Sequence, residues 1–123
     1  MDMSAPAPAS PDGLAIVEQW LNEARTGAMG LPQLMETAGK LQAAGQIDAA
    51  ILLYKTWVEA SDSPLRQVAC FNWGTLLGEK HRHAEAVEVY ETALKLAPNF
   101  AQARLNLGHQ LEHLGRHEEA LDA

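Results

Sequence analysis

The chain has 123 residues, of which 47% are hydrophobic, and a formal net charge of -7 at pH 7. The apolar content excludes wholesale disorder, and the length suits a fold with a modest core. The negative charge argues against a nucleic-acid partner, and no apolar run approaches the roughly 20 residues of a membrane helix. The first ten residues lack a secretory signal pattern. We therefore expect a cytoplasmic protein that contacts neither nucleic acid nor membrane.

The N-terminal part divides into two segments. Residues 1–10 are rich in alanine and proline, and this composition predicts a flexible leader. Residues 11–30 place apolar side chains at helical spacing and end in glycines, which predicts an N-terminal helix over 11–26. Its apolar face would consist of Leu14, Val17, Trp20, Leu21 and Ala24, and its end would be marked by Gly27 and Gly30.

From residue 31 onward the chain repeats a set of small and large residues at spacings of 34 and 36. The periodicity predicts helices over 31–44, 47–60, 65–79, 83–96 and 99–114, and a short one over 117–123. Pro98 is expected to end a helix and Asn99 to cap the next one. The recurring positions are Ala50 and Tyr54 in the first repeat, Gly74, Leu77, Ala86, Tyr90 and Pro98 in the second, and Gly108, Leu111 and Ala120 in the third.

This spacing and residue set resemble the tetratricopeptide repeat (TPR) family. The resemblance implies an all-α right-handed solenoid of antiparallel helix pairs over residues 31–123, with repeats at 31–66, 67–100 and 101–123, the last incomplete. It also implies that Gly74 faces Ala86 across a close helix pair and that Gly108 faces Ala120. The position of His81 is commonly glycine, and the other repeats have glycine there.

The resemblance implies a binding role for the concave surface, which the first helix of each repeat lines. Asn72 and Asn106 each lie two residues before a motif glycine and would face this groove. Carboxamides can donate to and accept from the main chain of an extended peptide; the alternative is that asparagine is simply common at this place. We expect a protein or peptide partner and no cofactor. The remaining groove candidates are Thr75, Gln102, His109 and His113.

Two other functions remain open. The strings FNWG and ARLNLGHQLE resemble the repeat region of bacterial O-linked N-acetylglucosamine transferase-like (SPINDLY-type) proteins. That resemblance implies the substrate-recruiting N-terminal arm of a protein O-glycosyltransferase whose catalytic region is absent from this chain. The incomplete third repeat implies a self-assembly scaffold, because its leucines are expected to lack cover. These leucines are Leu107, Leu111, Leu114 and Leu121.

No catalytic residue or metal ligand is expected. The segment from His109 to His113 matches an inverted zinc-peptidase string. Packing within a repeat helix accounts for its other positions, so we interpret these histidines as solvated. Cys70 is the single cysteine, and its apolar neighbours predict a buried, structural thiol.

Overall fold

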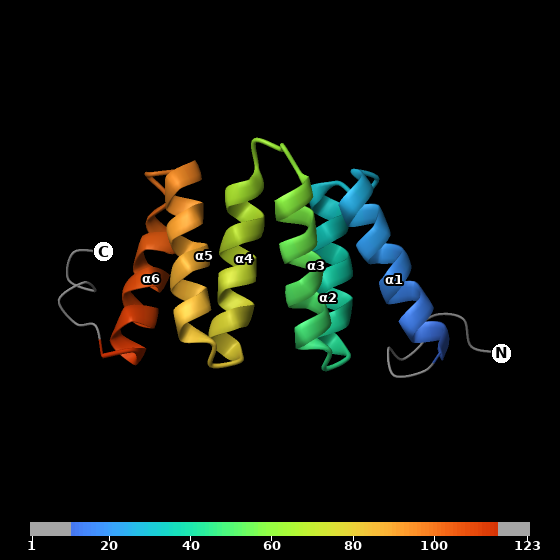
Figure 1. Cartoon of the computed structure of the whole chain (residues 1–123). Helices are drawn as coiled ribbons and strands as arrows, with labels where there is room; N and C mark the ends of the chain where they lie inside the picture. Colours follow the sequence, from blue (N-terminus) through green and yellow to red (C-terminus); the bar gives the residue numbers. More distant parts are fainter. Residues whose placement is uncertain (1–10, 116–123) are drawn as a thin grey trace. The chain divides into compact units, whose positions relative to one another are not determined.

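The computed structural model describes residues 11–115, with side chains from residue 15 onward. Within this range the chain forms six α-helices and no strand, which confirms the expected all-α helical-repeat fold class (Figure 1). The chain divides into two compact units, Met1–Ser61 and Asp62–Ala123. The first unit contains α1 to α3 and the second contains α4 to α6.

The first unit is built around α3. It consists of α1 (Pro11–Thr26), α2 (Leu31–Ala43) and α3 (Ile47–Ala60). α2 buries one stripe, with Leu34, Ala38 and Leu41 at the spacing of a helix face. α3 packs against both other helices, and it can do so because its buried face is wider. That face comprises Ala50, Ile51, Leu53, Tyr54, Trp57 and Val58.

An indole of α3 fixes the connection between α1 and α2. Trp57 donates a buried hydrogen bond of 2.7 Å from Nε1 to the carbonyl oxygen of Met29. The Met29 side chain is itself buried. Gly27, two residues earlier, has a φ of 86°, which glycine adopts without a Cβ clash. The sequence pattern identifies Trp57 as a packing residue but does not reveal this bond.

The second unit consists of α4 (Arg66–Glu79), α5 (His83–Leu96) and α6 (Ala101–His113). α5 packs against both neighbours, and α4 also meets α6 directly. Short connections make successive helices antiparallel (Figure 1). The C-terminal ends of α4 and α6 therefore lie at the same end of the unit as the N-terminal end of α5.

The turns after α2, α4 and α6 share one backbone conformation. Gly45, His81 and Gly115 have φ values of 78°, 59° and 76°. In each turn the N–H of this residue donates to the carbonyl three residues earlier. Such left-handed C-terminal positions favour glycine, so the sequence comparison that placed His81 in a glycine position is confirmed. His81 carries the strain of a β-carbon in this conformation.

The prediction that Asn99 caps α6 is wrong. The helix begins at Ala101, its N-cap residue is Phe100, and no side chain caps it. Phe100 occupies this place because its ring stacks on Phe71 of α4 at a centroid distance of 5.2 Å. The turn is closed instead by Arg104, whose Nη2 donates to the carbonyl oxygen of Pro98 at 2.8 Å.

The side chain nearest to Gly74 is the ring of Tyr90. A β-carbon at Gly74 would lie 2.8 Å from Cε1 of Tyr90 and 2.9 Å from its Cζ. The glycine therefore accommodates the Tyr90 ring, and Ala86, the residue expected to face it, is fully buried. The small side chain of Ala86 allows α4 and α5 to pack closely, and the Tyr90 ring fills the space beside Gly74. Gly108 is half-buried on α6.

The leucines of α6 are covered more completely than expected. Leu107 and Leu111 are 7% and 3% exposed. They lie on the buried face of α6, and α5 packs against α6. In α6 and its C-cap, the exposed leucines are Leu105 and Leu114, at 61% and 38%. Ala120, Leu121 and the short helix expected over 117–123 lie outside the described residues. Among the described helices, none is long and apolar enough to span a bilayer.

Candidate functional site

A single hydroxyl joins the three helices of the second unit. Tyr90 on α5 is 1% exposed. Its Oη lies 2.9 Å from Oγ1 of Thr75 on α4 and accepts a 3.2 Å hydrogen bond from Nδ2 of Asn106 on α6. A buried phenol needs polar partners of this kind. Two groove candidates, Thr75 and Asn106, therefore meet at one buried oxygen.

An aromatic cluster lies beside this hydroxyl. The Phe71 ring is tilted by 56° to that of Tyr90 at a centroid distance of 6.0 Å. On another side it stacks on Phe100. Phe71 and Phe100 are both half-buried, so part of this apolar surface faces solvent. Offset and tilted aromatic pairs of this kind add about 0.5–1.5 kcal/mol beyond their buried area.

A side chain of α6 approaches α4 closely at Gly78. A β-carbon there would lie 2.8 Å from Nε2 of Gln110 on α6. The amide oxygen of Gln110 is 2.6 Å from Nδ1 of His83. Because an amide oxygen only accepts, the proton in this bond belongs to His83 Nδ1. One glutamine thus connects the N-terminal residue of α5 to the surface of α4.

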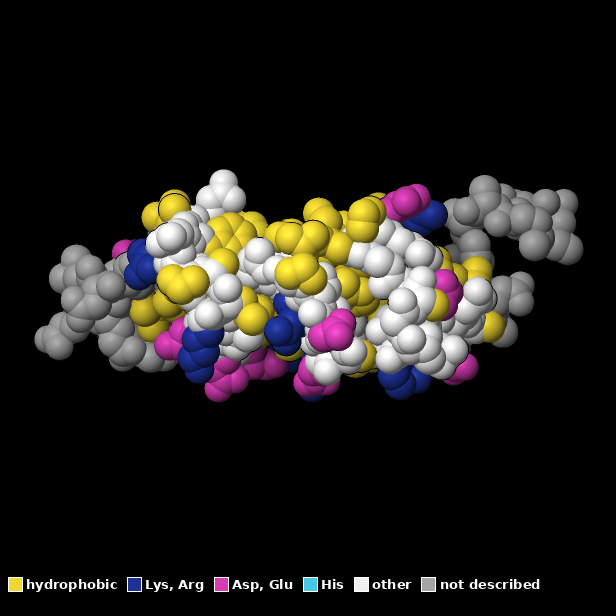
Figure 2. Space-filling model, turned by 90° about the horizontal axis from the view of Figure 1, so that it is seen from above, with side chains coloured by type: hydrophobic (Ala, Val, Ile, Leu, Met, Phe, Trp, Pro, Cys, Tyr) yellow, Lys and Arg dark blue, Asp and Glu magenta, His cyan; other side chains and the backbone are white. Residues whose placement is uncertain are grey.

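Histidines gather at this end of the unit. The rings of His83 and His113 stack at 4.5 Å with an angle of 5°. His81 packs edge-on against His83 at 5.7 Å. Figure 2, which views the molecule from above Figure 1, shows no histidine among the described side chains on that face. This agrees with their position at the opposite helix ends.

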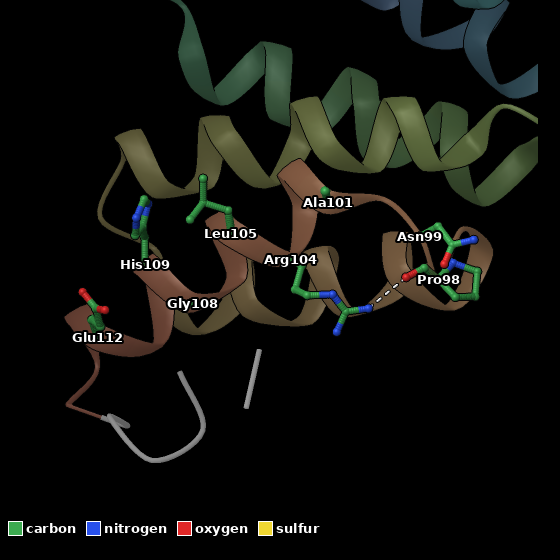
Figure 3. Close-up of a pocket in the computed structure, with 8 residues that line it drawn as sticks. All are labelled: Pro98, Asn99, Ala101, Arg104, Leu105, Gly108, His109 and Glu112. Carbon is green, nitrogen blue, oxygen red and sulfur yellow. Dashed lines mark hydrogen bonds between the residues drawn. The ribbon is translucent and has the colours of Figure 1, made fainter. Parts of the chain in front are cut away.

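A shallow pocket of about 580 Å³ lies on the face of α6 that does not pack against α5. His109 and Leu105 border it on one side, and the Pro98–Arg104 hydrogen bond closes one end (Figure 3). Its wall is mostly polar or small, apart from Leu105. The lining residues are Pro98, Asn99, Ala101, Arg104, Leu105, Gly108, His109 and Glu112.

The predicted groove residues occupy two helices but do not form one cluster. Thr75 and Asn106 meet through Tyr90, whereas His109 borders the pocket and His113 stacks on His83. Helical spacing aligns the four groove candidates of α6 along one face of the helix; these are Gln102, Asn106, His109 and His113. Asn72 is half-buried on α4, and Gln102 is exposed on α6. We name the groove face as Phe71, Asn72, Thr75, Gln102, Asn106 and His109.

The sequence did not identify Phe71, Gln110 or the Tyr90 hydroxyl as parts of the site. One signal was available: Gly74 and Gly78 are four residues apart and share a face of α4. Two small residues on one face indicate that other helices approach there. The residues opposite them, Tyr90 and Gln110, come from α5 and α6, and only the three-dimensional fold shows which these are.

Cys70 carries the one thiol of the chain. Burial raises the pKa of the Cys70 thiol from 9.0 to about 11, although Arg66 partly offsets this rise. Cys70 is therefore neutral and inert at physiological pH, as expected for a structural thiol. Among the side chains that the structure describes, those of residues 15–115, no group of three or more His, Cys, Asp or Glu is arranged to hold a metal ion. The groove face instead offers amides, a hydroxyl and aromatic carbon.

Comparison with known proteins gives a family match within the second unit. No curated protein matches the chain, so the resemblance to O-linked N-acetylglucosamine transferase-like proteins is shown by no relative. Repeats of the TPR family generally mediate protein–protein interactions and are typically not catalytic. Residues 71–123, which include most of α4 and all of α5 and α6, match the family model described as tetratricopeptide repeat.

Proposed function

We propose that the second unit binds an extended segment of another protein along the groove face. The observation that carries the proposal is the meeting of Thr75 from α4 and Asn106 from α6 at the Tyr90 hydroxyl. This contact holds the polar groups of two helices on one surface. Repeat proteins use the surfaces formed by successive helices in this way.

The groove face provides two kinds of contact. Half-buried Phe71, with Phe100 stacked on it beside the groove face, offers aromatic carbon for an apolar side chain. Asn72, Gln102 and Asn106 offer carboxamides, which match the alternating N–H and C=O groups of an extended main chain. A ligand that uses both would combine sequence-tolerant main-chain bonds with selection at one apolar position.

Charge is distributed in agreement with this role. None of the six residues of the groove face carries a formal charge. The acidic side chains of α5 are exposed, and they include Glu88 and Glu91. A neutral face avoids the desolvation penalty of buried charges when a ligand covers it. We therefore expect binding that depends weakly on salt concentration.

The test is a selection of peptides from a random library displayed on phage, followed by affinity measurements on the selected peptides. Substituting Asn72→Ala together with Asn106→Ala should weaken binding about tenfold or more, because each lost hydrogen bond contributes about 0.5–1.5 kcal/mol. The matched control is Glu88→Ala with Glu91→Ala on α5, which should leave the affinity unchanged. Failure of the wild-type chain to enrich any peptide would contradict the proposal.

A role as the substrate-recruiting arm of a protein O-glycosyltransferase would use the same groove face. It rests on the asparagine pair Asn72 and Asn106 and on the local strings FNWG and ARLNLGHQLE. The test is the reading frame of the full-length protein: a glycosyltransferase region following the repeats would support this role, and its absence would remove it.

Self-assembly is a further candidate, and the exposure of Leu105 favours it. This side chain is 61% exposed and borders the pocket on α6. A leucine beside a shallow hollow is a contact that a second copy could cover. Sedimentation velocity over a wide concentration range tests this: association that Leu105→Ser abolishes supports it, and a monomer at all concentrations contradicts it.

A further inference from the structure

The hydrogen bonds around Tyr90 have only one consistent direction. Oγ1 of Thr75 lies 3.0 Å from the carbonyl oxygen of Phe71, to which it donates. A hydroxyl has one proton, so the 2.9 Å contact between Thr75 and Tyr90 must be donated by the phenol. The phenol proton is then occupied, and the 3.2 Å contact with Asn106 must come from the amide. The direction therefore runs from Asn106 through Tyr90 and Thr75 to Phe71.

This direction determines which way the Asn106 carboxamide points. Its Nδ2 faces Tyr90, so Oδ1 lies on the other arm of the amide. A flipped amide would place two acceptors opposite each other, because the Tyr90 proton is already directed to Thr75. Without the Thr75 hydroxyl, the Tyr90 proton would be free to turn to Oδ1, and the opposite orientation would become favourable.

We propose that Tyr90 and Thr75 are positioning residues that fix the Asn106 carboxamide with its oxygen available, so that this point of the groove accepts a main-chain N–H of the bound segment. The inference rests on the proposed function, since it identifies the polarity of one contact within the same groove face. It excludes proline and other N-alkylated residues from the ligand position over Asn106, because these lack the N–H.

Tyr90 is suited to this role because its ring is enclosed by its neighbours. Gly74 packs directly against the ring, and Phe71 is tilted against it. The phenol is 1% exposed, so water does not compete for its hydroxyl. Asn106 is only half-buried, which leaves the other arm of its amide within reach of a ligand. The Nδ2 arm of the Asn106 carboxamide is thus hydrogen-bonded within the protein, and the Oδ1 arm is left for the ligand.

The first experiment needs no ligand. Thr75→Val removes the hydroxyl at nearly constant volume, whereas Thr75→Ser retains it as the matched control. In ¹H–¹⁵N spectra, the side-chain amide signals of Asn106 should shift clearly in Thr75→Val and in Tyr90→Phe, and should stay close to the wild-type values in Thr75→Ser. Unchanged Asn106 signals in Thr75→Val would overturn the directed network. Backbone amide spectra confirm that each variant is folded.

The second experiment uses a peptide selected by phage display on the wild-type chain, with each backbone nitrogen methylated in turn. At one position, methylation should weaken peptide binding to the wild-type chain and to Thr75→Ser. This loss of affinity should be about 2- to 10-fold larger than the loss that the same methylation causes in Thr75→Val, a range that corresponds to one neutral hydrogen bond. Equal sensitivity in Thr75→Val and Thr75→Ser would overturn the positioning role while leaving peptide binding intact. If the wild-type chain selects no peptide, the proposed function fails and the recognition role of Asn106 fails with it.

Discussion

Replacing Gly74 by alanine should destabilise the second unit, although the same change usually stabilises a helix. The added β-carbon would lie 2.8 Å from Cε1, 2.9 Å from Cζ and 3.0 Å from Cδ1 of Tyr90. Real β-carbons rarely approach so closely, so the ring would have to move. Phe71 and the hydrogen bonds to Thr75 and Asn106 prevent this movement.

The magnitude follows from two opposing effects. Alanine gains about 1 kcal/mol over glycine inside a helix, whereas overpacking in a rigid core costs about 1–3 kcal/mol. We expect a net loss of about 1 kcal/mol for Gly74→Ala and clearly more for Gly74→Leu. A loss of 1 kcal/mol lowers the melting temperature by roughly 3–6 °C in a chain of this size.

Two other glycines serve as controls. Gly39 lies inside α2, and a β-carbon there would meet nothing within 4 Å, so Gly39→Ala should stabilise by about 0.5–1 kcal/mol. A β-carbon at Gly78 would contact the end of the flexible Gln110 side chain, so Gly78→Ala should be nearly neutral. Thermal and urea unfolding, followed by circular dichroism, measure all three. An alanine at Gly74 that stabilises as much as one at Gly39 would refute the packing argument.

Three further predictions concern single side chains. His81→Gly should stabilise the chain by about 1 kcal/mol in urea unfolding, because it removes a β-carbon from a turn with a φ of 59°; destabilisation would show that the histidine contacts outweigh this strain. Trp57→Phe should destabilise the first unit by about 1–2 kcal/mol, since it leaves the Met29 carbonyl without its buried donor, and hydrogen exchange in the α1–α2 connection should accelerate. Cys70, with its pKa raised to about 11 by burial, should resist iodoacetamide at pH 8 and react only when urea unfolds the chain. The raised pKa protects the Cys70 thiol from alkylation most fully well below pH 11, and this protection is lost as the pH rises through that value. Rapid labelling of the folded chain at pH 8 would contradict the buried position of Cys70.

Much of the fold was predictable because local patterns determine it. Glycine, alanine and tyrosine recur at spacings near 34, and this spacing predicts the helix pairs. Gly45 and Gly115 indicate the turns, and the structure shows that His81, at the same place in its repeat, shares their left-handed backbone. These features depend on backbone conformation and on which side chains fit between two adjacent helices, and both are encoded within one repeat.

The site was less predictable because its contacts join helices that are distant in sequence. The sequence predicts Asn106 as a groove residue, but its bond to Tyr90 depends on how α6 packs against α5. The failed Asn99 cap has a similar cause, because the stacking of Phe100 on Phe71 determines where α6 begins. Local preference for a capping residue is worth about 1 kcal/mol, and tertiary packing of two aromatic rings can exceed it.

The most direct test of the central claim is an NMR titration of the ¹⁵N-labelled chain with a peptide selected by phage display. The account predicts that the largest shifts occur in the backbone and side-chain amides of the groove face, with Asn72 and Asn106 among them. The exposed side of α5, which carries Glu88 and Glu91, should remain nearly unchanged. Shifts confined to α5 or to the first unit would contradict the claim that α4 and α6 form the binding surface.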